Sequence, residues 1–413
     1  MITTTQLSNR LTVIVEEMDH VESVSYDLLV PGGLIVDGAG TVGASLIFAE
    51  LLGRGAGGMD SRQLSAAFDS AGIRHGEGVG MDRFSLSGSL VADKLERAIE
   101  LLSLMVREPS LPEEELPSIQ SVMLQDIEAL NDNPARKSMV ELTKLYYPAP
   151  FNRSSLGEAQ GISATTRETM VDLYKRYFVP ERAILSIAGK VKTSDVLEWV
   201  ERYLGGWSGC GSELPTFGAI SPHRYYPIEV DSAQLQIVMA GPSVKFNEAA
   251  YYDGKVAVSL LGASMFGRLF VEVREKRGLC YSVYARHGAT ASYGTVTAYV
   301  GTTPERAQES LDVLLREFEG LRGSVADEEL ARAKTNLKAT LVMGEESPGS
   351  RAASNAGDWW LLKRIRPLSE ISAAIDAVSL ESVDAFVERY PFRPCSILTL
   401  GRHPLEVPAD VVG

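Results

Sequence analysis

Histidine is scarce in this sequence, and the few histidines present are far apart. They are His20, His75, His223, His287 and His403. No two of them lie within one helical turn of each other, so no helix can present two imidazoles on one face. A zinc site built from two histidines of a single helix is therefore excluded.

Cysteine and long apolar runs are also lacking. The three cysteines, Cys210, Cys280 and Cys395, form no CxxC pair and are odd in number, which indicates a reducing compartment without structural disulfides. The first residues lack the basic stretch and apolar run of a signal peptide, and no run of about 18 apolar residues is present. We therefore expect a cytoplasmic protein with no membrane span.

Basic side chains are fewer than acidic ones in this sequence. The 413 residues include 54 acidic and 40 basic side chains, for a formal net charge of −14. Such a chain repels phosphate backbones, so we expect no nucleic-acid partner. The hydrophobic content of 45% and the charged content of 23% are typical of a folded globular protein, and the length suggests two or three domains.

The second half of the chain repeats the pattern of the first. Strands are expected at 24–30 and 84–90 and an amphipathic helix at 92–106, and these recur as strands at 235–240 and 295–300 and a helix at 304–321. The offset stays near ~210 residues over several elements, which indicates duplication. The expected fold class is α+β, with two homologous domains that each pack helices on one face of a largely antiparallel sheet.

A glycine-, serine- and proline-rich stretch separates the two halves. It begins with Gly-Cys-Gly-Ser at position 209 and continues as a polar segment to Pro227. This composition is typical of a linker. The expected organisation is a domain over 1–208, a linker over 209–227 and a second domain over 228–413.

Several segments resemble the insulinase-like (M16) metallopeptidase family, and in particular its short bacterial members related to mitochondrial processing peptidase. The most specific is Arg-Glu-Lys-Arg-Gly-Leu-Cys-Tyr-Ser-Val at 274–283, supported by the segments 261–270 and 174–180 and by Ala188-Gly189. The resemblance covers nearly the whole chain. It implies two homologous α+β domains that face each other like a clamshell around a substrate chamber.

The chain departs from this family at the metal site. Catalytic members carry His-x-x-Glu-His on the first helix, where two imidazoles at i and i+4 bind zinc and the glutamate acts as general base. The corresponding positions here are Leu46, Ala49 and Glu50, and the downstream carboxylate ligand falls on Asp126. A hydrocarbon neither ligates zinc nor accepts a proton, so this degenerate site predicts a chain without metal.

Two carboxylates nevertheless remain at that site. Glu50 and Asp126 are open to two interpretations, a site for another cation or a solvated pair that meets an arginine. Two carboxylates fall short of the six or more oxygens that calcium takes, which favours the second interpretation.

The C-terminal half keeps the residues that the family places against its substrate. The resemblance gives this role to Arg274 and Tyr281, whose guanidinium and phenol can donate hydrogen bonds to a peptide carbonyl and to a growing oxyanion. The alternative is structural: Arg274 pairs with Glu272 or Glu275, and Tyr281 packs as a strand aromatic. Two further candidates are not expected to be functional: His287 is expected to be structural or exposed, and the Trp359-Trp360 pair is expected to pack in the core or at an interface.

The favoured hypothesis is a non-catalytic subunit of a heterodimeric zinc metalloendopeptidase. A paralogue with intact His-x-x-Glu-His would bring the zinc, and this chain, inactive alone, would close the chamber and position a peptide or unfolded polypeptide in trans. The alternative is a non-proteolytic scaffold or peptide-binding protein of the same fold. An autonomous hydrolase with an unrelated site is the third and least supported reading.

Overall fold

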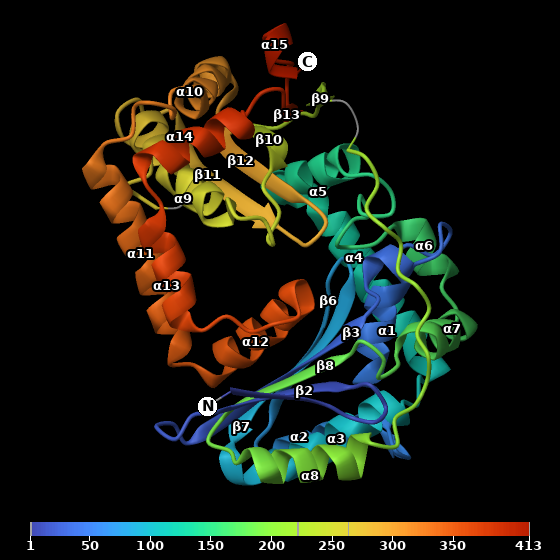
Figure 1. Cartoon of the computed structure of the whole chain (residues 1–413). Helices are drawn as coiled ribbons and strands as arrows, with labels where there is room; N and C mark the ends of the chain where they lie inside the picture. Colours follow the sequence, from blue (N-terminus) through green and yellow to red (C-terminus); the bar gives the residue numbers. More distant parts are fainter. Residues whose placement is uncertain (1, 221–222, 263, 413) are drawn as a thin grey trace. The chain divides into compact units, whose positions relative to one another are not determined.

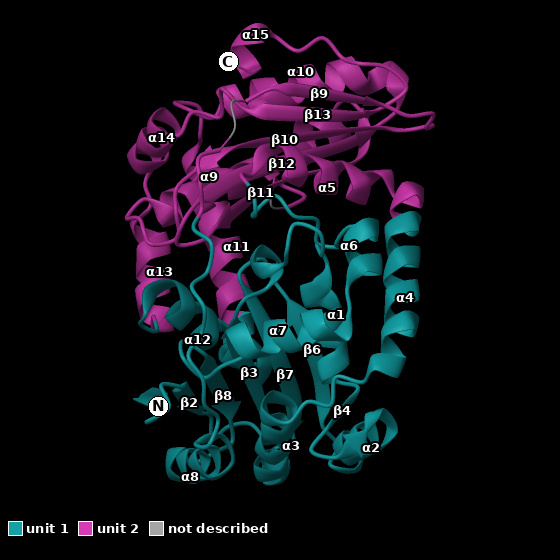
Figure 2. Ribbon diagram, turned by 90° about the vertical axis from the view of Figure 1, so that its right-hand side faces the viewer, with its two compact units in different colours: residues 1–129, 149–216, 343–365 teal, residues 130–148, 217–342, 366–413 magenta. Residues whose placement is uncertain are grey.

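The alternating strands and amphipathic helices of the sequence assemble into two α+β units. The computed structural model describes residues 2–220, 223–262 and 264–412. Unit 1 comprises Met1–Ala129, Ala149–Thr216 and Met343–Ile365, and unit 2 comprises Leu130–Pro148, Phe217–Val342 and Arg366–Gly413 (Figure 2). The chain passes between the units at five points, and one of them, 216–217, lies inside the segment 209–227 expected as the linker. Positions 221 and 222 of that segment, and the outermost residues 1 and 413 of the two expected domains, lie outside the described residues.

The sheet of unit 1 has six strands in the order β1-β2-β8-β3-β7-β6. All neighbouring pairs are antiparallel except β2 and β8, which run parallel. The strands are β1 (Ile2–Gln6), β2 (Thr12–Glu17), β3 (Ser23–Pro31), β6 (Arg74–Val79), β7 (Arg83–Val91) and β8 (Ile184–Gly189), and a separate pair is β4 (Gly55–Ala56) with β5 (Met59–Asp60).

Seven helices cover one face of this sheet. They bury their apolar stripes against strand residues such as Val13, Val15 and Leu28, which are fully or almost fully buried. The helices are α1 (Ala44–Leu52), α2 (Ser61–Ser70), α3 (Leu95–Arg107), α4 (Leu116–Ala129), α6 (Ala159–Ala164), α7 (Arg167–Tyr177) and α8 (Thr193–Leu204).

Unit 2 repeats this arrangement with five strands in the order β11-β12-β10-β13-β9. Only the β13–β9 pair is parallel. The strands are β9 (Tyr225–Glu229), β10 (Leu235–Ser243), β11 (Cys280–Ala289), β12 (Gly294–Thr302) and β13 (Ser396–Gly401). The helices are α9 (Tyr251–Gly262), the π-helix η5 (Phe270–Glu275), α10 (Ala307–Glu319), α11 (Asp327–Glu345), α13 (Leu368–Ala377), α14 (Leu380–Arg389) and α15 (Ala409–Val412).

The two sheets share one pairing pattern, which confirms the expected repeat. Read from the parallel pair, β2-β8-β3-β7-β6 of unit 1 corresponds to β9-β13-β10-β12-β11 of unit 2, and parallel and antiparallel neighbours match throughout. The expected fold class, two related α+β units with largely antiparallel sheets, is therefore correct. No helix among the described residues is long and apolar enough to cross a membrane.

Each sheet also carries one helix on its opposite face, and that helix comes from the other half of the sequence. Helix α12 (Pro348–Leu362) packs across β3 and β8 of unit 1, with Ala356 against Leu29 and Ile184 (Figure 1). Helix α5 (Pro134–Tyr146) packs on β10 and β13 of unit 2, where Tyr146 joins Leu398. Each unit is therefore completed by a helix from outside its own half of the chain.

Polar contacts fix α12 to the sheet of unit 1. Arg351, which is 7% exposed, donates from Nε to Glu16 at 2.9 Å, and the Asn355 amide donates to the same carboxylate at 2.6 Å. At the other end of the helix the Trp360 indole N–H donates to Asp82 at 3.1 Å. Trp359 and Trp360 thus belong to a structural contact, as expected.

Candidate functional site

Helix α1 contains the three positions that the resemblance assigns to the metal-binding motif, and the side chain of Asp37 holds its first turn. The buried carboxylate of Asp37 accepts from the backbone N–H groups of Gly43 and Ser45 at 2.8 and 2.9 Å and from the Ser45 hydroxyl at 2.5 Å. Burial raises the pKa of Asp37, although these three donors act in the opposite direction. The start of α1 is therefore held in place by buried hydrogen bonds.

The four positions that the resemblance assigns to the metal site differ in their exposure to solvent. Leu46 is half-buried and Ala49 is buried, whereas Glu50 and Asp126 are exposed on α1 and α4. Glu50 and Asp126 line one pocket of about 200 Å³, together with Arg54 and the apolar side chains Ile119, Val122 and Met123. The structure thus brings the two carboxylates to the same pocket.

Arg54 gives this pocket a charge balance that differs from a metal site. It lies in the turn just after the end of α1, and its guanidinium is 3.6 Å from the Glu50 carboxylate. The i, i+4 spacing of these two residues was visible in the sequence, but Arg54 was not singled out there. The pocket therefore contains two carboxylates and an arginine, which agrees with the second interpretation of Glu50 and Asp126.

The residues present do not fit zinc. Leu46 and Ala49 contribute only hydrocarbon at the positions where the resemblance expects a ligand and a base. Across the described residues, no group of three or more histidine, cysteine, aspartate or glutamate side chains is placed to hold a metal ion.

Arg274 and Tyr281 form the second candidate site. Arg274 lies on the π-helix η5, a type of helix that is frequent at functional sites. Its Cζ atom lies 4.9 Å from the centre of the Phe270 ring and 5.3 Å from that of Tyr281. The structure brings the two predicted residues into direct contact through a cation–π interaction.

A β-bulge turns Tyr281 outward. Cys280 pairs with Thr302 and Ser282 pairs with Gly301, which leaves Tyr281 without a partner in the ladder. Bulges re-aim the side chain that they insert. The side chain is 83% exposed, so it does not pack as an ordinary strand aromatic.

The ion pairs near Arg274 are made by other residues. Glu272 binds Lys276 at 2.5 Å and Arg277 at 2.6 Å, and these hydrogen bonds lower the pKa of Glu272. In the part of the chain that the structure describes, Arg274 has no carboxylate partner. Its N–H groups are therefore available to an acceptor outside the chain.

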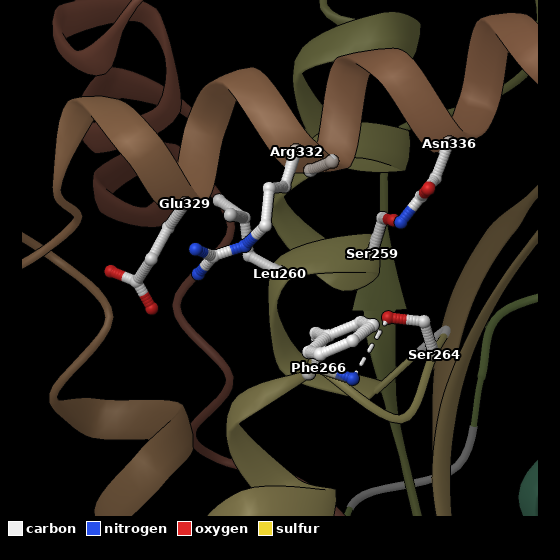
Figure 3. A pocket seen from close by; sticks show the side chains of 9 residues that line it. Ser259, Leu260, Ser264, Phe266, Glu329, Arg332 and Asn336 are labelled. Carbon is white, nitrogen blue, oxygen red and sulfur yellow. Dashed lines mark hydrogen bonds between the residues drawn. The ribbon is translucent and has the colours of Figure 1, made fainter.

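The segment before η5 is anchored to α11 beside a small pocket (Figure 3). Arg268 binds Glu329 of α11 at 2.9 Å, and the backbone N–H of Phe266 donates to the Ser264 hydroxyl at 3.2 Å. The pocket holds about 20 Å³, room for a single water molecule. Its size excludes substrate binding, and the contacts around it fix the position of η5.

Comparison with known proteins points to one family. The profile described as "Peptidase M16 inactive domain" matches residues 164–337. The chain is 24% identical to the uncharacterized zinc protease YmxG of Bacillus subtilis over 386 residues, which covers 92% of this chain and 93% of that protein. It is 25% identical to the uncharacterized zinc protease Rv2782c of Mycobacterium tuberculosis over 407 residues, with 97% and 93% covered.

Solved structures share the fold over almost the whole length. The peptidase M16 inactive domain from Pseudomonas fluorescens superposes with a TM-score of 0.89 at 22% identity and covers 99% of both chains. A protease from Helicobacter pylori gives 0.89 at 16% identity, covering 97% and 99%. A chain of Complex III2 from Candida albicans, bound to Inz-5, gives 0.83 at 17% identity, covering 97% and 96%. These solved structures show that the chain shares their fold, and the profile match and the sequence relatives make it similar to the insulinase-like (M16) metallopeptidase family.

Proposed function

We propose that the chain is the non-catalytic subunit of a heterodimeric zinc metalloendopeptidase. The observation that supports this most is an asymmetry between two sites. At the metal site Leu46 and Ala49 stand where a ligand and the general base belong, whereas Arg274 and Tyr281 contact each other with their polar groups available. The zinc site is lost, and the substrate-positioning pair is kept.

In this proposal Arg274 and Tyr281 act on a peptide held at the partner's active site. The guanidinium donates hydrogen bonds to a carbonyl of the peptide and fixes its position. The phenol O–H donates to the oxygen that gains charge when water attacks the scissile bond. Both groups are neutral or cationic donors, so they stabilise the same developing negative charge.

The partner is a paralogue that carries His-x-x-Glu-His and supplies the zinc. Together the two chains would close a chamber around a peptide or unfolded polypeptide. We place the assembly in the cytoplasm, which is supported by the three thiols of this chain: Cys210, Cys280 and Cys395 are all free.

The direct test is reconstitution. The purified chain should not cleave a quenched-fluorescence peptide library, the paralogue alone should cleave it slowly, and the mixture should cleave it much faster. A chelator should abolish the activity of the mixture. Cleavage by this chain alone that is lost with chelator would contradict the proposal and favour an autonomous hydrolase.

A scaffold function is the second candidate, and the likeness to a chain of Complex III2 favours it. In that case the Arg274–Tyr281 segment serves folding only. Size-exclusion chromatography and pull-down experiments distinguish the two candidates. A stable partner without any zinc motif would support the scaffold, whereas a partner with His-x-x-Glu-His would support the peptidase subunit.

A further inference from the structure

A larger pocket lies in unit 2 and is lined by residues of α9, the strand β11 and α11. Its volume of about 450 Å³ lies within the range of small-molecule and peptide-end sites. We call it the α9–β11 pocket; its main lining residues are Lys255, Val258, Tyr284, Arg286, His287 and Leu337.

The α9–β11 pocket contains two cations and no acidic side chain in its lining. Lys255 is half-buried, with its ammonium 5.8 Å from the centre of the Tyr251 ring, and Arg286 lies 4.5 Å over the ring of Tyr284. Within the described ranges of the chain, neither cation forms an ion pair. Burial, reinforced by the nearby charge of Arg366, lowers the pKa of Lys255.

His287 adds an unsatisfied polar group to the same wall. Its ring hydrogen-bonds to the backbone of Val244, while Nε2 is buried and has no partner among the residues that the structure describes. Burial lowers the pKa of His287 to about 4, so the ring is neutral at physiological pH. The positive charge of the pocket therefore comes from Lys255 and Arg286.

The position of Lys255 is costly unless something else occupies the pocket, because this side chain is partly withdrawn from water, whereas Arg286 is exposed at the same wall. A cation withdrawn from water without a counter-charge is destabilising, and the chain as a whole has 14 more acidic than basic groups to offer as partners. None of those carboxylates lines the pocket. An anionic ligand in the pocket would offset the free-energy cost of the cation that has no counter-charge in the folded chain.

The remaining walls favour a peptide over a small inorganic anion. Val258, Leu337 and the Tyr284 ring provide apolar surface beside the two cations. In addition, β11 is an edge strand, paired only with β12 among the described strands, and an edge strand offers backbone groups to an extended peptide. The pocket thus combines cationic side chains, apolar side chains and the backbone groups of an edge strand, and a peptide can contact all three.

We propose that the α9–β11 pocket binds the carboxylate of a peptide. Lys255 and Arg286 pair with the carboxylate, and the adjoining side chain of the peptide packs on Val258 and Leu337. The carboxylate comes from the C-terminus of the peptide or from an acidic side chain. The site does not depend on the proposed peptidase role, because binding takes place on this chain alone and is measured without a partner.

Isothermal titration calorimetry on the full chain tests the proposal. The probe is the N-acetylated tetrapeptide Ala-Ala-Leu-Phe with a free carboxylate, for which we expect a Kd below about 1 mM at low salt. Loss of one charge-assisted pair in Lys255→Met or Arg286→Gln should weaken binding about tenfold. Lys175→Met, an exposed lysine on α7 that undergoes the same charge change, is the matched control and should bind as the parent does.

Two further probes separate the sources of the carboxylate. The C-terminal amide of the same tetrapeptide removes the end charge, and an amidated peptide with a central glutamate places the charge on a side chain. Binding of the free acid alone assigns the site to a C-terminus, and binding of the glutamate peptide assigns it to a side chain. The proposal is overturned if neither of the two peptides with a carboxylate binds below about 1 mM, if the uncharged amide binds as tightly as the free acid, or if binding is the same in both pocket variants as in the parent.

Discussion

The guanidinium of Arg274 lies 5.3 Å from the centre of the Tyr281 ring, across the junction between the π-helix and the bulged start of β11. Two local irregularities are needed for this contact. The π-helix places Arg274 near the strand, and the bulge turns Tyr281 out of the ladder. Both side chains are exposed, so their contact contributes little to stability and leaves their donor groups accessible.

The first prediction concerns this pair in the reconstituted peptidase. Arg274→Ala and Tyr281→Phe should each lower turnover about 10- to 100-fold, because each removes a donor to developing negative charge. Steady-state cleavage of a peptide by the mixed subunits measures the effect. Lys276→Ala, which removes a neighbouring exposed cation that pairs with Glu272, should leave turnover unchanged. If both test variants turn over the peptide as fast as the parent, Arg274 and Tyr281 do not have the role proposed for them.

The second prediction concerns metal content. The purified chain should contain less than about 0.1 zinc per molecule, because Asp126 alone keeps the expected ligand type, and Glu50, which stands in place of a histidine, lies 3.6 Å from Arg54. Elemental analysis by plasma mass spectrometry measures this directly. Chelator should leave the Tm unchanged. One zinc per chain after dialysis would contradict the interpretation of this pocket.

Much of the fold was predictable from periodicity, because each strand and helix has its own local pattern. The strand expected at 84–90 is β7, and the helix expected at 304–321 contains α10. The exchange of α5 and α12 was not predictable, since an apolar stripe shows that a helix packs but not on which sheet.

The candidate site was predictable to a similar degree. Arg274 and Tyr281 stand out through the resemblance of their segment to the family. The bulge that leaves Tyr281 unpaired has no sequence signal comparable to a turn or a cap. The cations of the α9–β11 pocket were also missed, because Lys255 and Arg286 come from segments far apart in the sequence and share no motif.

The third prediction concerns the attachment of α12. Arg351→Met should destabilise unit 1 by about 3 kcal/mol. The substitution removes a hydrogen-bond donor from the carboxylate of Glu16, and that carboxylate is too buried for water to replace the donor. Arg351 also pairs with Glu345, so the loss affects two carboxylates. Thermal unfolding followed by circular dichroism measures the change in Tm.

An exposed ion pair provides the control for this substitution. Lys190→Met removes the pair with Glu22, whose side chains are 46% and 83% exposed, and it should change stability by no more than about 0.5 kcal/mol. Equal effects of Arg351→Met and Lys190→Met would show that the buried contact does not hold α12 in place.

The fourth prediction concerns the pH dependence of stability. Burial raises the pKa of Asp27 on β3 to about 6, and the opposing charge of Arg83 offsets this only in part. One oxygen of this carboxyl, Oδ1, is buried without a hydrogen-bond partner among the described residues. Because the pKa is raised in the folded state, the folded chain binds more protons than the unfolded chain between about pH 4 and pH 6. The favourable contribution of Asp27 is therefore complete below about pH 4 and is lost as the pH rises through about 6.

Asp27→Asn removes this ionisation while it keeps the shape of the side chain. The variant should be more stable than the parent by about 2 kcal/mol at pH 8, where the parent must bury a charged carboxylate, and the gain should vanish near pH 4. Asp19→Asn, which changes an exposed carboxylate outside the strands, should have little effect at either pH. Thermal unfolding of the three proteins at both pH values measures these differences. A gain for Asp27→Asn that is equal at pH 4 and pH 8 would show that the amide stabilises the fold by packing or hydrogen bonding, and that the charge of Asp27 is not the cause.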